Sequence, residues 1–237
     1  GLIWVKPLAV KSLLVGLELL IPSPATVFRR LLFLIKESAF YETVFYSIVR
    51  IMFGYILALF FAVILAVVTA RFHFLYVLLA PLMGVIKATP VASFIIIALI
   101  WLKAGGVVTL SVFLMVLPMV WANLYQGIIH TDPQLLEMSR MFSFSIYKKV
   151  RWIYIPAVLP YFVSAVNTGL GFAWKAGVAA EVLGTPRRSI GHSLYNAKIY
   201  LETADLFAWT VVVILLSVLL EKVVIRMINH AVGNSRS

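Results

Sequence analysis

Cysteine is absent from this chain of 237 residues, and charged residues make up only 12% of it. Without cysteine the chain can hold no disulfide framework, thiolate nucleophile or cysteine-ligated metal. A soluble domain contains about 25% charged and about 45–50% apolar residues, whereas 63% of this chain is hydrophobic and its mean hydropathy is +1.04. The composition therefore indicates an integral membrane protein.

Alternating strand patterns are also missing, and the apolar runs are long. A helix needs about 20 mainly apolar residues to cross a bilayer. We therefore predict an all-α fold, a polytopic transmembrane helical bundle of about five to six spans that forms a single domain over residues 1–237. A chain of this length has no room for a separate soluble catalytic domain, so any chemistry must lie within the bundle or belong to a partner.

Acidic residues are few, with 9 Asp and Glu against 20 Lys and Arg, which gives a formal net charge of +11. In a membrane protein such an excess is first a signal of topology and of contact with lipid headgroups. Attraction of an anionic substrate is a second interpretation.

The beginning of the chain is interrupted by charges and prolines. We expect Gly1–Val5 to be the end of a first span shortened by truncation, followed by an interfacial connection that the prolines near Pro22 end. Ser23 or Thr26 can then cap an amphipathic surface helix.

Five further apolar runs are expected to be spans, at about 46–70, 75–102, 107–129, 156–180 and 206–224. The second is broken near Pro90, and because proline removes a backbone donor, we expect that break to face the bundle or a cavity. Small residues at Gly169, Gly171 and Gly177 should let helices approach closely. Parity then places residues 131–156, the Arg71 turn and the C-terminal tail on one side of the membrane, and the Lys103 turn and residues 181–205 on the other.

Residues 131–156 form a charged segment that also carries many apolar side chains. Asp132 and Pro133 are suited to begin a helix, which should run to about Phe142. The chain should bend after it, and Ser145 can cap a second helix that enters the membrane near Pro156. The uncovered apolar side chains predict a docking element for a second, soluble protein.

Within this segment Glu137-Met138-Ser139 is followed after three residues by Ser143, after nine more by Ile153, and after one more by Ile155-Pro156. The register resembles the cytoplasmic-loop signature of the membrane-spanning permease subunits of binding-protein-dependent ATP-binding-cassette importers, which reads Glu-Ala-Ala, three residues, Gly, nine residues, Ile, one residue, Leu-Pro. Four positions differ, since Met138 and Ser139 replace the alanines, Ser143 the glycine and Ile155 the leucine.

The resemblance extends over nearly the whole chain, because IPSPATVF, Thr89-Pro90, TDPQLLE, LPYFVSAV and AWKAGVAAEVLG are similar to the branch that imports nitrate, sulfonates, taurine, bicarbonate or pyrimidine vitamin precursors. It implies a multi-pass permease in a prokaryotic inner or plasma membrane that conducts a small anionic solute. The implied partners are a second permease copy, two ATPase subunits and an external solute-binding protein. ATP and Mg²⁺ would be bound by the ATPase, so no cofactor is expected in this chain, which also lacks a GxxxxGK[ST] phosphate loop.

In this family the loop docks on the ATPase and lies between the fourth and fifth spans. The resemblance implies this coupling role, within residues 131–156, for Glu137, Met138, Ser139, Arg140, Ser143, Ile153 and Pro156. We name the whole range, residues 131–156, the coupling segment.

Polar residues near span breaks and ends are candidates for the translocation pathway. Each also has a purely structural interpretation: Lys87 could be a snorkelling lysine, and Lys175 and Glu181 could anchor helix ends. Lys175 and Glu181 lie six residues apart and do not face each other on a straight helix. Trp101, Trp121, Trp152 and Trp174 are expected as interfacial anchors. The pathway candidates are Lys87, Thr89, Pro90, Trp174, Lys175 and Glu181.

The rival to an importer subunit is a self-sufficient channel or proton-coupled carrier, which would need ionisable residues along its pathway. A membrane-embedded enzyme is a third possibility, but the sequence offers no cluster of histidines or carboxylates for it. His73, His130 and His230 lack metal-ligand spacing. We therefore expect neither a catalytic nor a metal site.

Overall fold

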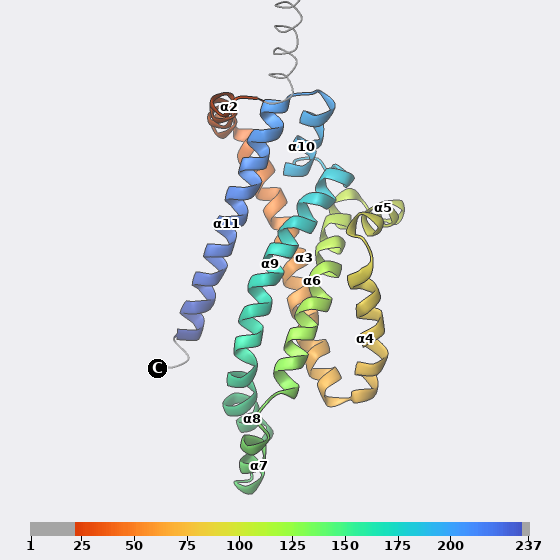
Figure 1. Ribbon diagram of the computed structural model, residues 1–237, viewed down its shortest axis with the longest axis vertical. Helices are drawn as coiled ribbons and strands as arrows, with labels where there is room; N and C mark the ends of the chain where they lie inside the picture. Colours follow the sequence, from red (N-terminus) through yellow and green to blue (C-terminus); the bar gives the residue numbers. More distant parts are fainter. Residues whose placement is uncertain (1–21, 234–237) are drawn as a thin grey trace, which may run out of the picture.

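The computed structural model describes residues 22–233, and these residues are almost entirely helical, with no strand among them (Figure 1). The prediction of an all-α helical bundle is confirmed. The expected shortened span at Gly1–Val5 and the connection that follows it lie outside the described residues.

Eleven segments follow one another along the described chain, and one of them is a short π-helix named η1. Their bounds are α2 Pro24–Lys36, α3 Ser38–Arg71, α4 His73–Ala88, α5 Val91–Trp101, α6 Ala104–Ile129, α7 Pro133–Met141, α8 Ile146–Lys149, η1 Val150–Tyr154, α9 Ile155–Gly184, α10 Ile190–Ile199 and α11 Thr203–Gly233.

Among the described residues, three helical segments are long and apolar enough to cross a membrane: α3, α6 and the continuous run Ile146–Gly184. The pair α4 and α5 could make a fourth, because the two are bent by 94° at the predicted break. Helix α11 contains the predicted last span. The expected total of five to six spans stays a prediction.

The ends of the bundle are arranged as parity predicts (Figure 1). The turn after Arg71 and helices α7 and α8 lie at the lower end, toward which α11 also runs. Helices α2, α5 and α10 lie at the upper end. The coupling segment is thus separated from the polar 181–205 region by the length of the bundle.

Helix α2 is the predicted amphipathic surface helix. The Ser23 hydroxyl accepts a hydrogen bond from the Thr26 amide at 3.3 Å, and Pro24 occupies the first turn. Of this helix Leu34 is the buried residue. The Arg30 guanidinium donates to both carboxylate oxygens of Asp205 on α11, and this bond raises the pKa of Arg30 above its ordinary value. The surface helix is therefore tied to the last helix through its polar side.

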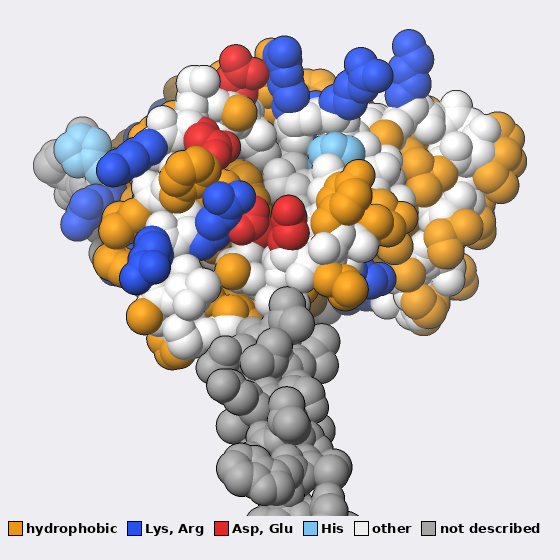
Figure 2. Space-filling view, turned by 90° about the horizontal axis from the view of Figure 1, so that it is seen from above, with side chains coloured by type: hydrophobic (Ala, Val, Ile, Leu, Met, Phe, Trp, Pro, Cys, Tyr) orange, Lys and Arg blue, Asp and Glu red, His pale blue; other side chains and the backbone are white. Residues whose placement is uncertain are grey.

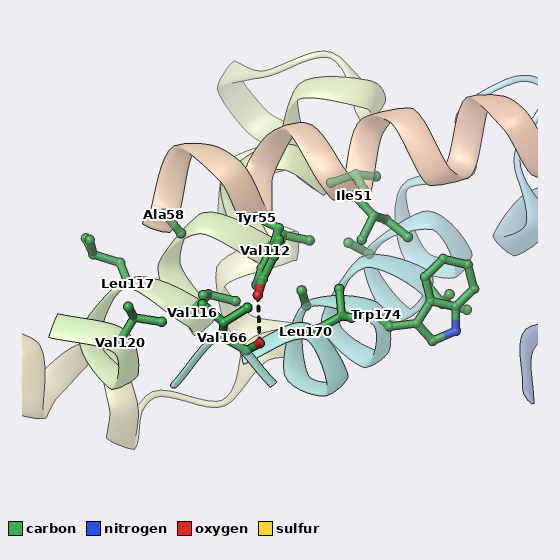
Figure 3. Packing of buried hydrophobic residues seen from close by; sticks show 14 of the residues in the cluster. Ile51, Tyr55, Ala58, Val112, Val116, Leu117, Val120, Val166, Leu170 and Trp174 are labelled. Atoms are coloured by element: carbon green, nitrogen blue, oxygen red, sulfur yellow. Dashed lines mark hydrogen bonds between the residues drawn. The ribbon is translucent and has the colours of Figure 1, made fainter. Parts of the chain in front are cut away.

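Helix α6 lies at the centre and packs most extensively against α9 and α3 (Figure 3). Val112, Val116 and Val120 are fully buried at intervals of four residues, the spacing of one helix face. The Tyr55 hydroxyl of α3 donates to the Val166 carbonyl of α9 at 2.6 Å. Its polar end is thereby satisfied inside an otherwise apolar core.

Close approach of α9 to α3 depends on Gly177, where an added Cβ would lie 2.5 Å from Ile51 Cγ1. At Gly169 the nearest atoms would be at 3.4 Å, whereas at Gly171 nothing lies within 4 Å. The predicted role of small residues in helix packing is therefore confirmed at Gly177, holds less tightly at Gly169, and is wrong for Gly171.

Helix ends differ from the predicted span ends, because the apolar run marks the bilayer rather than the helix. Helix α3 begins at Ser38, eight residues before the predicted start, and α9 continues to Gly184. The 181–205 region, expected as a polar loop, contains the ten-residue helix α10.

The predicted interfacial position is wrong for two of the four tryptophans. Trp121 and Trp174 are buried, and their indole N–H groups donate to the Thr69 hydroxyl and the Val213 carbonyl, both at 3.1 Å. Trp101 and Trp152 are exposed, as an interfacial position requires.

Candidate functional site

The coupling segment begins with a capped helix. The Asp132 carboxylate accepts a hydrogen bond from the Gln134 amide at 2.8 Å, and Pro133 is the first residue of α7. The side chain satisfies an amide that the helix itself cannot, and proline has no amide to satisfy. The predicted helix start is confirmed.

The end of α7 is a sharp turn centred on Ser143, which has a left-handed backbone with φ of 51°. The Ser143 amide donates to the Arg140 carbonyl at 3.0 Å, and the Phe144 amide donates to the Ser139 carbonyl at 2.9 Å. These are the two bonds of a Schellman motif, in which glycine usually takes the left-handed position. Serine accepts this conformation at a cost of about 1–2 kcal/mol.

Helix α7 presents two different faces. At about 100° per residue, Leu135, Met138 and Phe142 share one side with Met141, and all four are exposed to solvent in the single chain. Ser139 lies about 40° around the helix from Leu135, but it has no exposed surface and donates its hydroxyl to the Leu136 carbonyl at 2.7 Å. We name the four exposed apolar residues the α7 face.

Charge lies beside the α7 face. Glu137 is exposed about 40° around the helix from Met141, and Arg140 is exposed farther round, about 100° from Met141. An apolar patch with a charged rim has the composition of a protein interface. Ser139 is buried and so presents no surface to a partner in the single chain.

The joint into α9 is continuous helix. The Ser145 hydroxyl accepts a hydrogen bond from the Lys148 amide at 3.4 Å and so begins α8. In η1 the Ile155 amide donates to the Val150 carbonyl, five residues back, and Ile153 is buried. Pro156, which has no backbone amide to donate, follows this π-helical turn directly and lies within the continuous helix. The run Ile146–Gly184 therefore connects the α7 end of the molecule directly to its opposite end.

At that opposite end a carboxylate is completely buried. Glu181 has no exposed surface, and its Oε2 accepts hydrogen bonds from the Ser47 hydroxyl at 2.7 Å and the Gly191 amide at 3.2 Å. Arg50 Nη1 lies 3.7 Å from Oε1. A side chain at Gly191 would overlap the Glu181 backbone. The start of α10 can therefore approach Glu181 this closely only because residue 191 is glycine.

Arg50 also holds the turn that leads into α10. Its guanidinium donates to the carbonyls of Arg187 at 3.0 Å and Arg188 at 3.3 Å. The Ser47 hydroxyl accepts from the Ile190 amide at 2.9 Å. We name Ser47, Arg50 and Glu181 the polar cluster; it fixes the N-terminus of α10 against α3 and α9.

The structure does not gather the predicted pathway residues into one place. Lys87, Pro90 and Lys175 are exposed, so the break in α4–α5 lies on the surface of this chain rather than against its other helices. The Val85 carbonyl accepts from both the Thr89 hydroxyl at 2.8 Å and the Thr89 amide at 3.0 Å, which closes the last turn of α4 before the break. Trp174 is buried, as described above.

Glu181 pairs with Arg50, a partner that sequence reasoning missed. A signal existed, since Arg50 is the one charge in the 46–70 run and parity places it at the same end as Glu181. Ser47 carried no comparable signal, because a serine in an apolar helix has many ordinary roles.

Residues 54–234 match the family described as "Binding-protein-dependent transport system inner membrane component". The chain belongs to this family. The matched range contains the whole coupling segment and Glu181, while Ser47 and Arg50 lie just before it. The chain is therefore a permease component of an ABC transport system, and its relatives are named as transport subunits.

Individual relatives agree with the family. The chain is 22% identical to a Brucella melitensis protein described as "Probable ABC transporter permease protein", over 85% of this chain and 82% of the relative. It is 22% identical to the taurine transport system permease protein TauC of Escherichia coli, over 86% and 76%. With the nitrate import permease protein NrtB of Synechocystis it shares 26% identity over 59% and 51%.

Proposed function

We propose that this chain is the permease subunit of an ATP-driven importer and forms, with a second copy of itself, the pathway for a small anionic solute. An external binding protein would deliver the solute. Two separate ATPase subunits, which bind the ATP and Mg²⁺, would dock on the coupling segments.

The observation that carries the proposal is the α7 face with its charged rim, at the end of a continuous 39-residue helix. Two ATPases that close on nucleotide can move a membrane domain only by pushing on a rigid element. A short helix with a capped start and a hydrogen-bonded terminal turn is such an element, and the interface chemistry of its exposed side suits a protein partner.

An anionic solute is supported by charge and by the relatives. The names of TauC and NrtB state taurine and nitrate, and a Bacillus subtilis relative is named for aliphatic sulfonates. At the end opposite the coupling segment, Lys and Arg side chains project around the rim of the molecule (Figure 2). Arg187, Arg188 and Lys198 are exposed in this region, where a positive field would guide an anion toward the protein.

Reversal of one rim charge tests the docking role. We expect Glu137→Arg to reduce solute uptake by reconstituted vesicles about tenfold or more, because a misplaced charge at a desolvated interface is costly. Insertion into the membrane should be unchanged, since Glu137 is exposed. Glu221→Arg makes the same change on exposed α11 and serves as the matched control.

Copurification of the ATPase is the second measurement. The Glu137→Arg complex should lose the ATPase, while the Glu221→Arg complex retains it. Normal uptake and ATPase binding by Glu137→Arg would refute the docking role. Uptake by vesicles that contain this chain without any ATPase subunit would instead indicate the self-sufficient carrier.

A further inference from the structure

A second feature of the coupling end is an apolar groove that the docking role does not use. It has a volume of about 600 Å³ and lies between α3, α6 and the run α8–η1–α9. Val63 and Val67 of α3, Leu124 of α6, and Ile146 and Val150 of the coupling segment are among its walls. Val67 and Ile146 are 55% and 75% exposed, so the groove is open to its surroundings.

One cation interrupts this apolar lining. Arg71, the last residue of α3, is a lining residue of the groove, and within residues 22–233 its guanidinium makes no ion pair with a carboxylate. Lys148 and Lys149 lie between the lining residues Ile146 and Val150 in the sequence and add positive charge near the opposite wall. The groove therefore combines apolar walls with a positive mouth.

We propose that this groove binds an acyl chain of an anionic phospholipid whose phosphate pairs with Arg71. Basic sites between membrane helices are suited to anionic lipid headgroups. Along α3 the groove extends from Val63 to Arg71, eight residues or about 12 Å, which is close to the about 15 Å of hydrocarbon in one leaflet. A lipid held there spans its own leaflet and has its headgroup at the level of Arg71.

A helix from a second copy of the chain fits the groove less well. Its apolar side chains would match the walls, but it would leave Arg71 covered and unpaired unless it also placed a carboxylate there, and a charge buried without a partner is strongly unfavourable. A phospholipid supplies both the apolar chain and the negative charge. The inference requires only that the bundle lies in a bilayer, and it is independent of the solute and of the ATPase.

The absence of cysteine allows a direct test. A bimane fluorophore on Val67→Cys, in nanodiscs, reports quenching by brominated phosphatidylglycerol or brominated phosphatidylcholine. We expect about a fivefold preference for the anionic lipid, which corresponds to about 1 kcal/mol for one cation near the membrane surface. Val77→Cys on α4, equally exposed at 57% and outside the groove, should show no preference.

Charge removal identifies the headgroup contact. Arg71→Gln in the Val67→Cys background should abolish the preference, whereas Arg226→Gln on α11, an exposed cation outside the groove, should leave it. A preference that survives Arg71→Gln, or none in the parent, would overturn the proposal. Protection of the fluorophore from both lipids would also overturn it, because a protein segment would then fill the groove.

Discussion

Truncation of the buried carboxylate to give Glu181→Ala should be among the most destabilising single changes in this chain. It removes the acceptor for the Ser47 hydroxyl and the Gly191 amide. Arg50 loses its carboxylate and keeps two backbone carbonyls and the Tyr46 ring, 5.7 Å from its guanidinium. Breaking a buried ion pair from one side costs about 3–5 kcal/mol. For a chain of this size each kcal/mol shifts Tm by about 2–4 °C, so a loss of about 6–20 °C is expected.

Thermal unfolding in detergent, followed by the fraction that remains monodisperse, measures this loss. The matched control is Glu42→Ala, which removes a pair with Arg188 at 3.4 Å whose side chains are 56% and 63% exposed. Exposed pairs contribute about 0–1 kcal/mol, so its Tm should fall by no more than about 4 °C. Equal shifts for the two variants would refute the view that Glu181 is desolvated and paired. Glu181→Gln should lose less than Glu181→Ala, because its amide oxygen still accepts hydrogen bonds.

Two further predictions concern packing and backbone conformation, both measured as Tm in the same assay. Gly177→Ala should destabilise the protein, because its Cβ would lie 2.5 Å from Ile51 and overpacking costs about 1–3 kcal/mol. Gly171→Ala on the same helix should instead gain about 1 kcal/mol in helix propensity. A loss of stability at both positions would contradict the close approach at Gly177. Ser143→Gly should raise Tm by about 2–8 °C, because it relieves about 1–2 kcal/mol of strain in the left-handed backbone. Ser145→Gly, at a helix start, should change stability by only a few tenths of a kcal/mol. No gain at Ser143 would show that the turn is unstrained.

Local signals in the sequence predicted local structure well. Asp132-Pro133 begins a helix, Ser145 begins the next, and the chain bends between them at Ser143. Each of these features depends on hydrogen bonds between residues close in sequence, and the identity of the residue states which bond is available. Pro90 ends a helix for the same reason.

Contacts between distant segments were predicted poorly. Arg50 and Glu181 are 131 residues apart, and their pairing depends on how α3 and α9 are rotated about their axes, which a uniformly apolar run does not specify. The burial of Trp121 was missed for the same reason, since in an apolar helix periodicity does not distinguish the core from the lipid face. The burial of Ser139 was likewise not readable from its neighbours in the sequence.

The run Ile146–Gly184 has a mechanical consequence. At 1.5 Å per residue its 39 residues extend over about 58 Å, so it acts as a lever with one arm under α7 and the other at the polar cluster. A tilt of about 5° at the α7 end displaces the Glu181 end by about 5 Å, more than the 3.7 Å that separates Arg50 from Glu181. Regular helical bonding is altered along this lever at the π-helical turn η1 and at Pro156 and Pro160, which have no backbone amide. The stiffness of this stretch decides how much of a push reaches α10.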